Sequence, residues 1–323
     1  MLAAGVTAAF RAIATSAVVA FDIGVDERGN FIDLPTGAVN HLIPENYSRM
    51  KHGDLDAVSF FAGPLAAKAL RAERFTEFLR NAVAHERVVY VTTASVFSVP
   101  SASNLLLKTT ATHINILLAK MGLAPIVVAE QTRLSDSRLG YISQTVREIR
   151  SQSSAGRDVT IVPEHFRNQS VIFLDDLFNS GNTVDRAQRR LRNVSVADTF
   201  YLFAVRMDPQ VVGASDGGIE DCLNDAYITG SLESMGPMLQ RGNFVAVQKL
   251  LHVIFDPKHT DQLPGFLQEI PTASIVKLYA AAACDGLRHR RQRLYFPSVL
   301  VFETVLQERG ALDAEGHLTG APV

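Results

Sequence analysis

The chain has no tryptophan and only two cysteines, Cys222 and Cys284, among its 323 residues. The cysteines form no C-x-x-C pair and have no histidine pair nearby, which excludes a disulfide framework and argues against a cysteine-based zinc site. An excess of charge of one sign is also missing, because 31 Lys and Arg face 33 Asp and Glu, giving a net charge of −2. Nucleic-acid-binding domains are usually strongly basic, so we expect no nucleic-acid partner.

Long hydrophobic runs are absent from the sequence as well. No apolar run reaches the roughly 18 residues of a membrane span, and Arg11 interrupts an alanine-rich N-terminus that has no basic region before it. That pattern is a poor signal peptide, so we expect a cytoplasmic protein without a membrane partner. The sequence also lacks Gly-x-Ser-x-Gly, His-Glu-x-x-His and Walker A motifs, which removes several common enzyme signatures.

Short β-branched runs alternate with longer segments of helical period, and this alternation predicts an α/β fold with a parallel, doubly wound sheet. The expected strands are 17–23, 88–92, 126–129, 171–174 and 200–205, and the main helices between them are 60–84, 104–121 and 184–192. Ligands of such sheets bind beyond the carboxyl ends of the strands, so those ends are the first places to search for a site.

We predict two domains, an α/β domain over residues 1–215 and a helical C-terminal extension over 216–323. Within the first lies a long polar segment, Ser135–Asn168, rich in Ser, Arg and Gln. An insertion of this length inside a compact domain is often an active-site lid, so we expect a flexible hood there.

The most informative stretch is residues 171–183, Val-Ile-Phe-Leu-Asp-Asp-Leu-Phe-Asn-Ser-Gly-Asn-Thr. Four apolar residues predict a buried strand that ends in Asp175 and Asp176, followed by a turn and a helix that opens at Thr183. Backbone N–H groups at a helix N-terminus, with hydroxyls beside them, favour a phosphate. Acids next to a phosphate loop suit sugar hydroxyls or a magnesium ion and its waters. An N-capped helix after a strand with merely solvated acids is the structural alternative.

This pattern resembles the phosphoribosyl-pyrophosphate (PRPP) motif of type I phosphoribosyltransferases. The resemblance implies that Asp175 and Asp176 hold the ribose hydroxyls and contact Mg²⁺ indirectly, through ribose or water. It also implies the following ligands for the 5′-phosphate: Asn179, Ser180, Gly181, Asn182 and Thr183. Two positions depart from the family, since Asn179 replaces Thr, Ser, Ala, Val or Asp and Phe178 replaces a smaller aliphatic residue.

A second stretch, Tyr47-Ser-Arg-Met-Lys-His-Gly-Asp54, is similar to Tyr-Ser-Arg-Phe-Lys-x-Gly-Asp in ComF-like phosphoribosyltransferases of tellurite-resistance gene clusters. Met50 departs from the aromatic residue expected there, and the resemblance covers most of residues 17–206. Arg49 and Lys51 are cations that could meet a phosphate or diphosphate, or could be surface charges on a loop. By analogy with those clusters, we expect a role in nucleotide metabolism with an unusual nucleoside-like metabolite.

Type I enzymes grip the diphosphate of PRPP with a loop after an earlier strand and close a hood over it. The matching loop here would be Thr92, Thr93, Ala94 and Ser95, whose small side chains leave backbone N–H groups accessible to an anion. No Lys or Arg follows them directly. In the hood, Arg138 and Arg147 are candidates to cover the leaving diphosphate, with solvated or salt-bridged arginines as the alternative.

The function expected from this resemblance is magnesium-dependent phosphoribosyl transfer between PRPP and a base-like acceptor, in either direction. A non-catalytic regulatory protein that binds PRPP or a nucleotide on the same fold is the alternative, motivated by Asn179 and by the missing cation after Ser95. Phosphoaspartyl chemistry is disfavoured because the usual Asp-x-Asp spacing is absent. The acceptor is not identified by the sequence, and a homodimer is left open.

Overall fold

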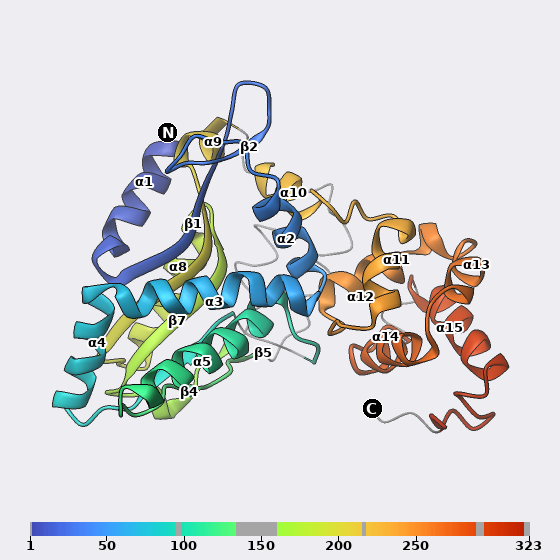
Figure 1. The fold of residues 1–323 in the computed structure, drawn as a ribbon. Coiled ribbons are helices and arrows are strands. Elements are labelled where there is room, and N and C mark those ends of the chain that lie inside the picture. The colour runs from blue at the N-terminus through green and yellow to red at the C-terminus, as the bar shows by residue number, and fades with distance from the viewer. Residues whose placement is uncertain (1, 95–97, 134–159, 215–217, 289–293, 320–323) are drawn as a thin grey trace. The chain divides into compact units, whose positions relative to one another are not determined.

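The computed structural model describes residues 2–94, 98–133, 160–214, 218–288 and 294–319. The chain divides into two compact units, which are described separately (Figure 1). The first consists of Met1–Glu45, Val58–Phe97 and Ser103–Leu223, and the second of Asn46–Ala57, Ser98–Ala102 and Asn224–Val323. The domain boundary predicted at residues 215 and 216 stays a prediction.

A six-stranded sheet with the order β2-β1-β8-β7-β3-β4 forms the centre of the first unit. All pairs are parallel except β1 with β2, which adds an antiparallel edge. The strands are β1 (Ala17–Val25), β2 (Phe31–Asp33), β3 (Val89–Thr92), β4 (Val127–Val128), β7 (Ser170–Phe178) and β8 (Asp198–Met207). The predicted α/β fold is confirmed, and β2 is an addition that the sequence did not reveal.

Helices cover both faces of this sheet, as a doubly wound fold requires (Figure 1). On one face, Phe75 of α4 contacts Phe200 of β8, with ring centroids 5.0 Å apart. The next residue on β8, Tyr201, faces the other way because side chains alternate along a strand, and it lies beside Ile13 of α1 and Gln188 of α8. The helices of this unit are α1 (Leu2–Ile13), α3 (Leu55–Arg71), α4 (Glu73–Ala84), α5 (Ala102–Lys120), α8 (Asn182–Asn193), α9 (Pro209–Ala214) and α10 (Ile219–Asn224).

A second, two-stranded sheet stands at the base of the predicted hood. Strands β5 (Thr132–Arg133) and β6 (Thr160–Ile161) pair antiparallel, so the two ends of the intervening segment lie side by side. Arg138 and Arg147, the two predicted hood arginines, lie outside the described residues.

The second unit is helical, with Phe255 stacked on Phe302 at 4.4 Å in its core. Its main helices are α11 (Leu232–Arg241), α12 (Gln248–Ile254), α13 (Leu263–Gln268), α14 (Thr272–Cys284) and α15 (Phe296–Glu308). It also includes the end of α2 (Leu42–Lys51), a helix that the sequence did not predict. None of the helices in the described ranges combines the length and apolar character needed to cross a bilayer.

Candidate functional site

Asp175 and Asp176 lie on β7, in the middle of the parallel sheet. The prediction that these acids end the strand is wrong, because β7 continues through Phe178. Leu177 and Phe178 keep their register with β8, and the Phe178 ring packs edge-on against Phe10 of α1 with centroids 5.1 Å apart. Packing on these two apolar residues therefore extends the strand past its acidic pair. Both acids are largely buried, with 7% and 6% exposure.

At this position β7 is paired with a neighbouring strand along only one of its two edges. Its pairing with β3 runs only from Ser170 to Phe173, whereas its pairing with β8 continues to Phe178. Within the described residues, the acids therefore lie where β7 has left β3 and retains β8 alone. This is the carboxyl edge of the sheet, the position at which open α/β sheets bind their ligands.

The predicted phosphate loop joins β7 to α8, and its one glycine, Gly181, has a left-handed backbone conformation. Gly181 adopts φ 83° and ψ −7° at the N-cap of α8, in the left-handed region where a Cβ is unfavourable. The N-cap residue has no side chain to cap α8, Asn182 N–H donates to Ser180 Oγ at a long 3.5 Å, and the first intrahelical bond runs from Asp185 N–H to Gly181 C=O at 3.0 Å. The N–H groups of the first turn therefore have no intrahelical acceptor, and with the helix dipole they favour an anion.

The departure at Asn179 has a structural explanation. Its side-chain Nδ2 donates to Glu220 Oε2 of α10 at 3.3 Å, so the amide links the start of the loop to a later helix of the same unit. The buried Oδ1 of Asn179 accepts no hydrogen bond from any described residue. The side chain that distinguishes this loop from the family pattern is thus partly engaged in holding α10.

The predicted diphosphate residues lie beside this strand. Thr92 ends β3 opposite Phe173, and Thr93 follows it; both are buried, with exposures of 0% and 1%. The Thr93 hydroxyl oxygen has no hydrogen-bond partner among the residues that the structure describes. Ala94 is half-buried, whereas Ser95 lies outside the described residues. The structure therefore places the first part of the predicted loop next to the strand that carries Asp175.

Gln131 is a site candidate that the sequence did not reveal. It comes shortly after β4, is 2% exposed, and its Nε2 donates to the Thr92 hydroxyl at 3.4 Å. Within the described part of the chain, its Oε1 is buried without a partner, like the Thr93 hydroxyl oxygen. Buried polar atoms are normally paired, so two unsatisfied atoms at neighbouring strand ends indicate a place for water or a ligand. Its position directly after an expected strand was the available signal.

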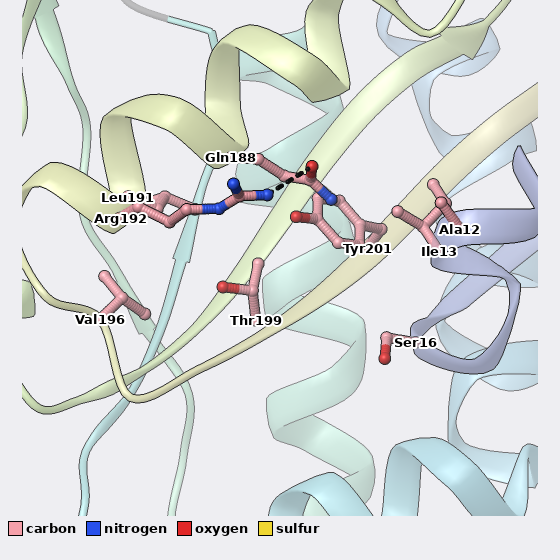
Figure 2. Close-up of a pocket in the computed structure, with 9 residues that line it drawn as sticks. All are labelled: Ala12, Ile13, Ser16, Gln188, Leu191, Arg192, Val196, Thr199 and Tyr201. Atoms are coloured by element: carbon pink, nitrogen blue, oxygen red, sulfur yellow. Dashed lines mark hydrogen bonds between the residues drawn. The ribbon is translucent and has the colours of Figure 1, made fainter. Parts of the chain in front are cut away.

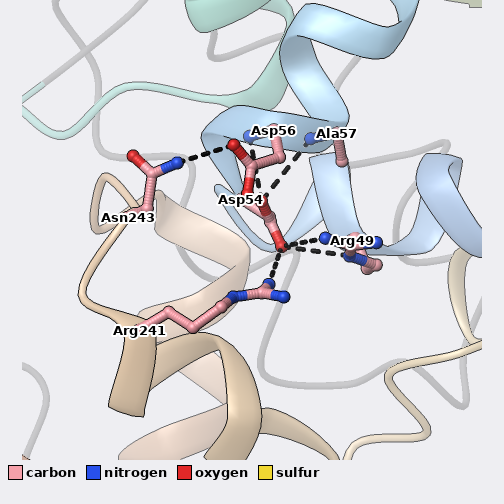
Figure 3. A network of polar contacts seen from close by, with 6 residues as sticks. All are labelled: Arg49, Asp54, Asp56, Ala57, Arg241 and Asn243. Carbon is pink, nitrogen blue, oxygen red and sulfur yellow. Dashed lines mark hydrogen bonds and ion pairs between the residues drawn. The ribbon is translucent and has the colours of Figure 1, made fainter.

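Arg49 and Lys51, the other predicted diphosphate residues, occupy the last turn of α2 in the second unit. Arg49 pairs with Asp54, whose side chain has no exposed surface, through contacts of 3.0 and 2.9 Å to Oδ2. Arg241 of α11 reaches the same oxygen at 2.7 Å (Figure 3). The Lys51 ammonium lies 5.6 Å from the centroid of the Tyr47 ring. A diphosphate role for these two cations stays a prediction.

The remaining residues of the 47–54 stretch build a junction. Ser48 Oγ donates to Asn224 C=O at 2.6 Å and accepts from Ile228 N–H at 2.9 Å. His52 Nδ1 lies 2.8 Å from Ser48 C=O, and burial, together with the charge of Lys249, lowers its pKa to about 3. These contacts tie the end of α2 to the later helical segments of the same unit.

The magnesium ion expected at the carboxyl edge, held partly by its substrate, stays a prediction. Among the described residues, no group of three or more His, Cys, Asp or Glu side chains forms a metal site. Mg²⁺ commonly binds through one or two carboxylates together with substrate phosphates, which the adjacent acids Asp175 and Asp176 and a PRPP diphosphate would supply.

Comparison with known proteins identifies the family. The family model described as PRTase ComF-like matches residues 40–295, which is more than half of the chain and includes both the β7–α8 segment and most of the helical C-terminal region. A search of curated proteins finds none that matches. The chain belongs to the ComF-like phosphoribosyltransferase (PRTase) family.

Proposed function

We propose that the protein transfers a phosphoribosyl group between PRPP and a nitrogen of a base-like acceptor, with Mg²⁺. One observation carries this proposal: Asp175 and Asp176 lie on β7 beyond the end of β3, and the same chain segment then forms the Gly181 turn and the start of α8. Carboxylates for a ribose and a loop for its 5′-phosphate thus follow one another within nine residues of chain.

Each part of the substrate has a candidate set of ligands. The carboxylates of Asp175 and Asp176 accept hydrogen bonds from the ribose hydroxyls, and the first N–H groups of α8 donate to the 5′-phosphate. The diphosphate lies toward Thr92 and Thr93, whose strand is the neighbour of β7. Magnesium, when bound, neutralises part of the diphosphate charge.

The transfer breaks the bond between C1′ and a diphosphate oxygen and forms a bond from C1′ to the acceptor nitrogen. Diphosphate leaves with the electron pair; an N–H nitrogen of a purine or pyrimidine then loses its proton, whereas a pyridine nitrogen, which has none, becomes a pyridinium. Positive charge develops on the ribose ring in between, and the two carboxylates stabilise it electrostatically. Binding and orienting two substrates supplies most of the rate enhancement, so no protein nucleophile is required.

A direct test measures PRPP consumption and diphosphate release with a panel of purine, pyrimidine and pyridine bases, with and without Mg²⁺. Magnesium-dependent turnover with at least one base, abolished in Asp175→Asn, supports the proposal. Tight PRPP binding by calorimetry without turnover on any base would instead support the regulatory alternative. Absence of PRPP binding in a folded protein would overturn both.

A further inference from the structure

A basic cavity of about 410 Å³ lies in the first unit, and none of the residues assigned to phosphoribosyl transfer lines it. Its walls come from the end of α1, β1 from Ala17 to Asp22, the end of α3, the start of α4 and, through Arg206, the carboxyl end of β8. Arg206 lies opposite Phe178 of β7, two residues after Asp176. The cavity therefore has its own lining residues, although one of them comes from the strand beside β7.

Positive charge dominates the wall of this cavity. Four cations line it, Lys68, Arg71, Arg74 and Arg206, against one acid, Asp22. Arg206 Nε lies 2.5 Å from Asp22 Oδ1, so this pair is neutral. The other three cations form no salt bridge with any residue that the structure describes. A net charge of about +3 on one small concave surface favours an anion with more than one negative charge.

Two of the three remaining cations are held in place by backbone carbonyls. Lys68 Nζ donates to Ala20 C=O at 3.2 Å, and Arg74 donates to Ala14 C=O at 2.9 Å. These contacts use one donor of each side chain and leave the others for a ligand, since Lys has three donors and Arg has five. Both anchors are neutral, so neither charge is cancelled.

The cavity also has an apolar wall. Phe10 lines it, and the Arg206 guanidinium lies 4.2 Å from the centroid of the Phe10 ring. Val18 and Val19 of β1 also line the cavity. A volume of about 410 Å³ falls within the usual range for small-molecule sites, about 300–1,000 Å³. A ligand that suits both walls has an anionic group and a flat apolar body.

We propose that this cavity binds a nucleoside monophosphate, with the phosphate between Lys68, Arg71 and Arg74 and the nucleoside along the side of Phe10. A second cavity of the same unit, shown in Figure 2, does not share these features. Its volume is about 230 Å³, and its one arginine, Arg192, donates to Gln188 Oε1 at 3.3 Å. Neither size nor charge favours a nucleotide there.

The test uses calorimetry on the full chain with AMP, with adenosine and with inorganic phosphate. AMP should bind, adenosine should bind at least tenfold more weakly, and the variant Arg71→Gln/Arg74→Gln should lose at least tenfold in AMP affinity. Arg80→Gln is the matched control, because Arg80 is an exposed arginine of the same helix as Arg74 and does not line the cavity. Thermal unfolding of each variant confirms that it is folded.

A second control separates this cavity from the PRPP site. Thr183→Val alters the predicted phosphate loop and should leave AMP affinity within about twofold of the wild type. Loss of AMP binding in Thr183→Val with no loss in Arg71→Gln/Arg74→Gln would overturn the proposal by placing AMP in the PRPP site. Equal binding of adenosine and AMP, an equal loss in Arg80→Gln, or no binding of AMP at millimolar concentration would also overturn it.

Discussion

Thr92 lies opposite Phe173 as the last residue pair that joins β3 to β7. Beyond this pair β7 continues to Phe178 with β8 alone on its flank, and Asp175 and Asp176 lie on that continuation. Thr92 is therefore the last residue of β3 and Thr93 follows it, so both hydroxyls lie beside β7, the strand that carries the acids. This offset between two neighbouring strands is the geometrical basis for placing ribose and diphosphate at one edge of the sheet.

We expect Asp176→Asn to lower PRPP–magnesium affinity or turnover by at least about tenfold while the protein remains folded. The variant keeps the shape of the side chain and removes its charge, so the ribose loses one charged hydrogen-bond partner. A tenfold effect corresponds to about 1.4 kcal/mol, a modest value for such a partner. Steady-state kinetics and PRPP titration measure the effect.

Asp185→Asn is the matched control for this experiment, because Asp185 is an exposed acid in the first turn of α8. Its removal should change PRPP affinity less than twofold or increase it slightly, since an acid near the loop repels phosphate. Unchanged kinetics in folded Asp176→Asn would count against the ribose role.

Replacing Gln131 separates stability from function. Gln131→Met removes an amide whose Oε1 is buried without a partner among the described residues, so the variant should be as stable as the wild type or more stable, by up to about 1 kcal/mol. If the amide faces the substrate, PRPP affinity or turnover should fall by at least about fivefold in the same variant. Urea unfolding and PRPP kinetics report the two effects, and Gln307→Met, at an exposed position of α15, is the control.

A different outcome for Gln131 has a clear meaning. If stability falls and kinetics stay unchanged, Gln131 supports the end of β3 through its bond to Thr92, and the unsatisfied oxygen is a site for structural water. A loss of activity in Gln307→Met as well would indicate a general effect of the substitution.

Periodicity predicted most of the sheet correctly, because β7 and β8 are nearly continuous apolar runs covered on both faces. The same reasoning misjudged two boundaries. An adjacent acidic pair suggested the end of β7, although the strand continues for Leu177 and Phe178. The apolar pattern over 60–84 suggested one helix, whereas Ala72 is extended, with φ −76° and ψ 115°, and separates α3 from α4. Local pattern does not reveal where tertiary packing turns the chain.

The candidate site also contains residues that the sequence predicted and residues that it did not. The residues of the β7–α8 loop are contiguous, so a single motif predicted them together. The sharing of Asp54 between two arginines was not predictable, since Arg241 lies 187 positions further along the chain. Gln131 was equally hidden, because an unsatisfied atom is recognised only when its surroundings are known.

We expect Asp54→Ala to destabilise the protein by about 3 to 5 kcal/mol. The substitution removes a carboxylate that both Arg49, which is 16% exposed, and Arg241 contact, and it also removes the acceptor of Asp56 N–H at 3.0 Å. Arg241→Gln should cost less than about 1 kcal/mol, because the Arg241 side chain is 49% exposed and solvent screens its charge. Urea unfolding followed by circular dichroism gives both values.

A comparison of the two arginines also tests the diphosphate role predicted for Arg49. Both contact Asp54, so Arg49→Gln and Arg241→Gln both weaken the same network. A tenfold loss of PRPP affinity in Arg49→Gln alone would support contact with the diphosphate. Equal affinities in the two folded variants would assign Arg49 to the network only.

His52 should make the protein sensitive to acid. Its pKa is about 3 in the folded chain, against an ordinary value of 6.5 for histidine, so below pH 6.5 the unfolded chain binds a proton that the folded chain does not. The contribution of His52 to the free energy of unfolding is therefore fully present above pH 6.5. Below that pH it falls by about 1.4 kcal/mol per pH unit, until the histidine of the folded state is protonated near pH 3. Between pH 6.5 and 4.5 the loss is about 2 to 3 kcal/mol.

His52→Gln tests this linkage, because glutamine keeps an N–H donor and does not titrate. Between pH 6.5 and 4.5, the free energy of unfolding of His52→Gln should fall less than that of the wild type. The difference between the two losses should be about 2 to 3 kcal/mol. His41→Gln, at an exposed position, should follow the wild type. Parallel stability curves for His52→Gln and the wild type would show that His52 does not carry the acid sensitivity.

Gly53 and Gly29 offer a matched pair that separates backbone strain from steric collision. Both have positive φ, 92° and 84°, so an alanine at either position is strained by roughly 1 kcal/mol. A Cβ on Gly29 would meet nothing within 4 Å, whereas a Cβ on Gly53 would lie 2.0 Å from the carbonyl oxygen of Val245.

The two segments that would collide are also hydrogen-bonded, because Val245 N–H donates to Gly53 C=O at 3.0 Å. Relieving the collision therefore means separating them. Gly53→Ala should therefore cost at least about 2 kcal/mol more than Gly29→Ala in urea unfolding, since it breaks a buried backbone contact as well as straining φ. Equal losses in the two variants would show that the 53–245 contact contributes little to the stability of the second unit.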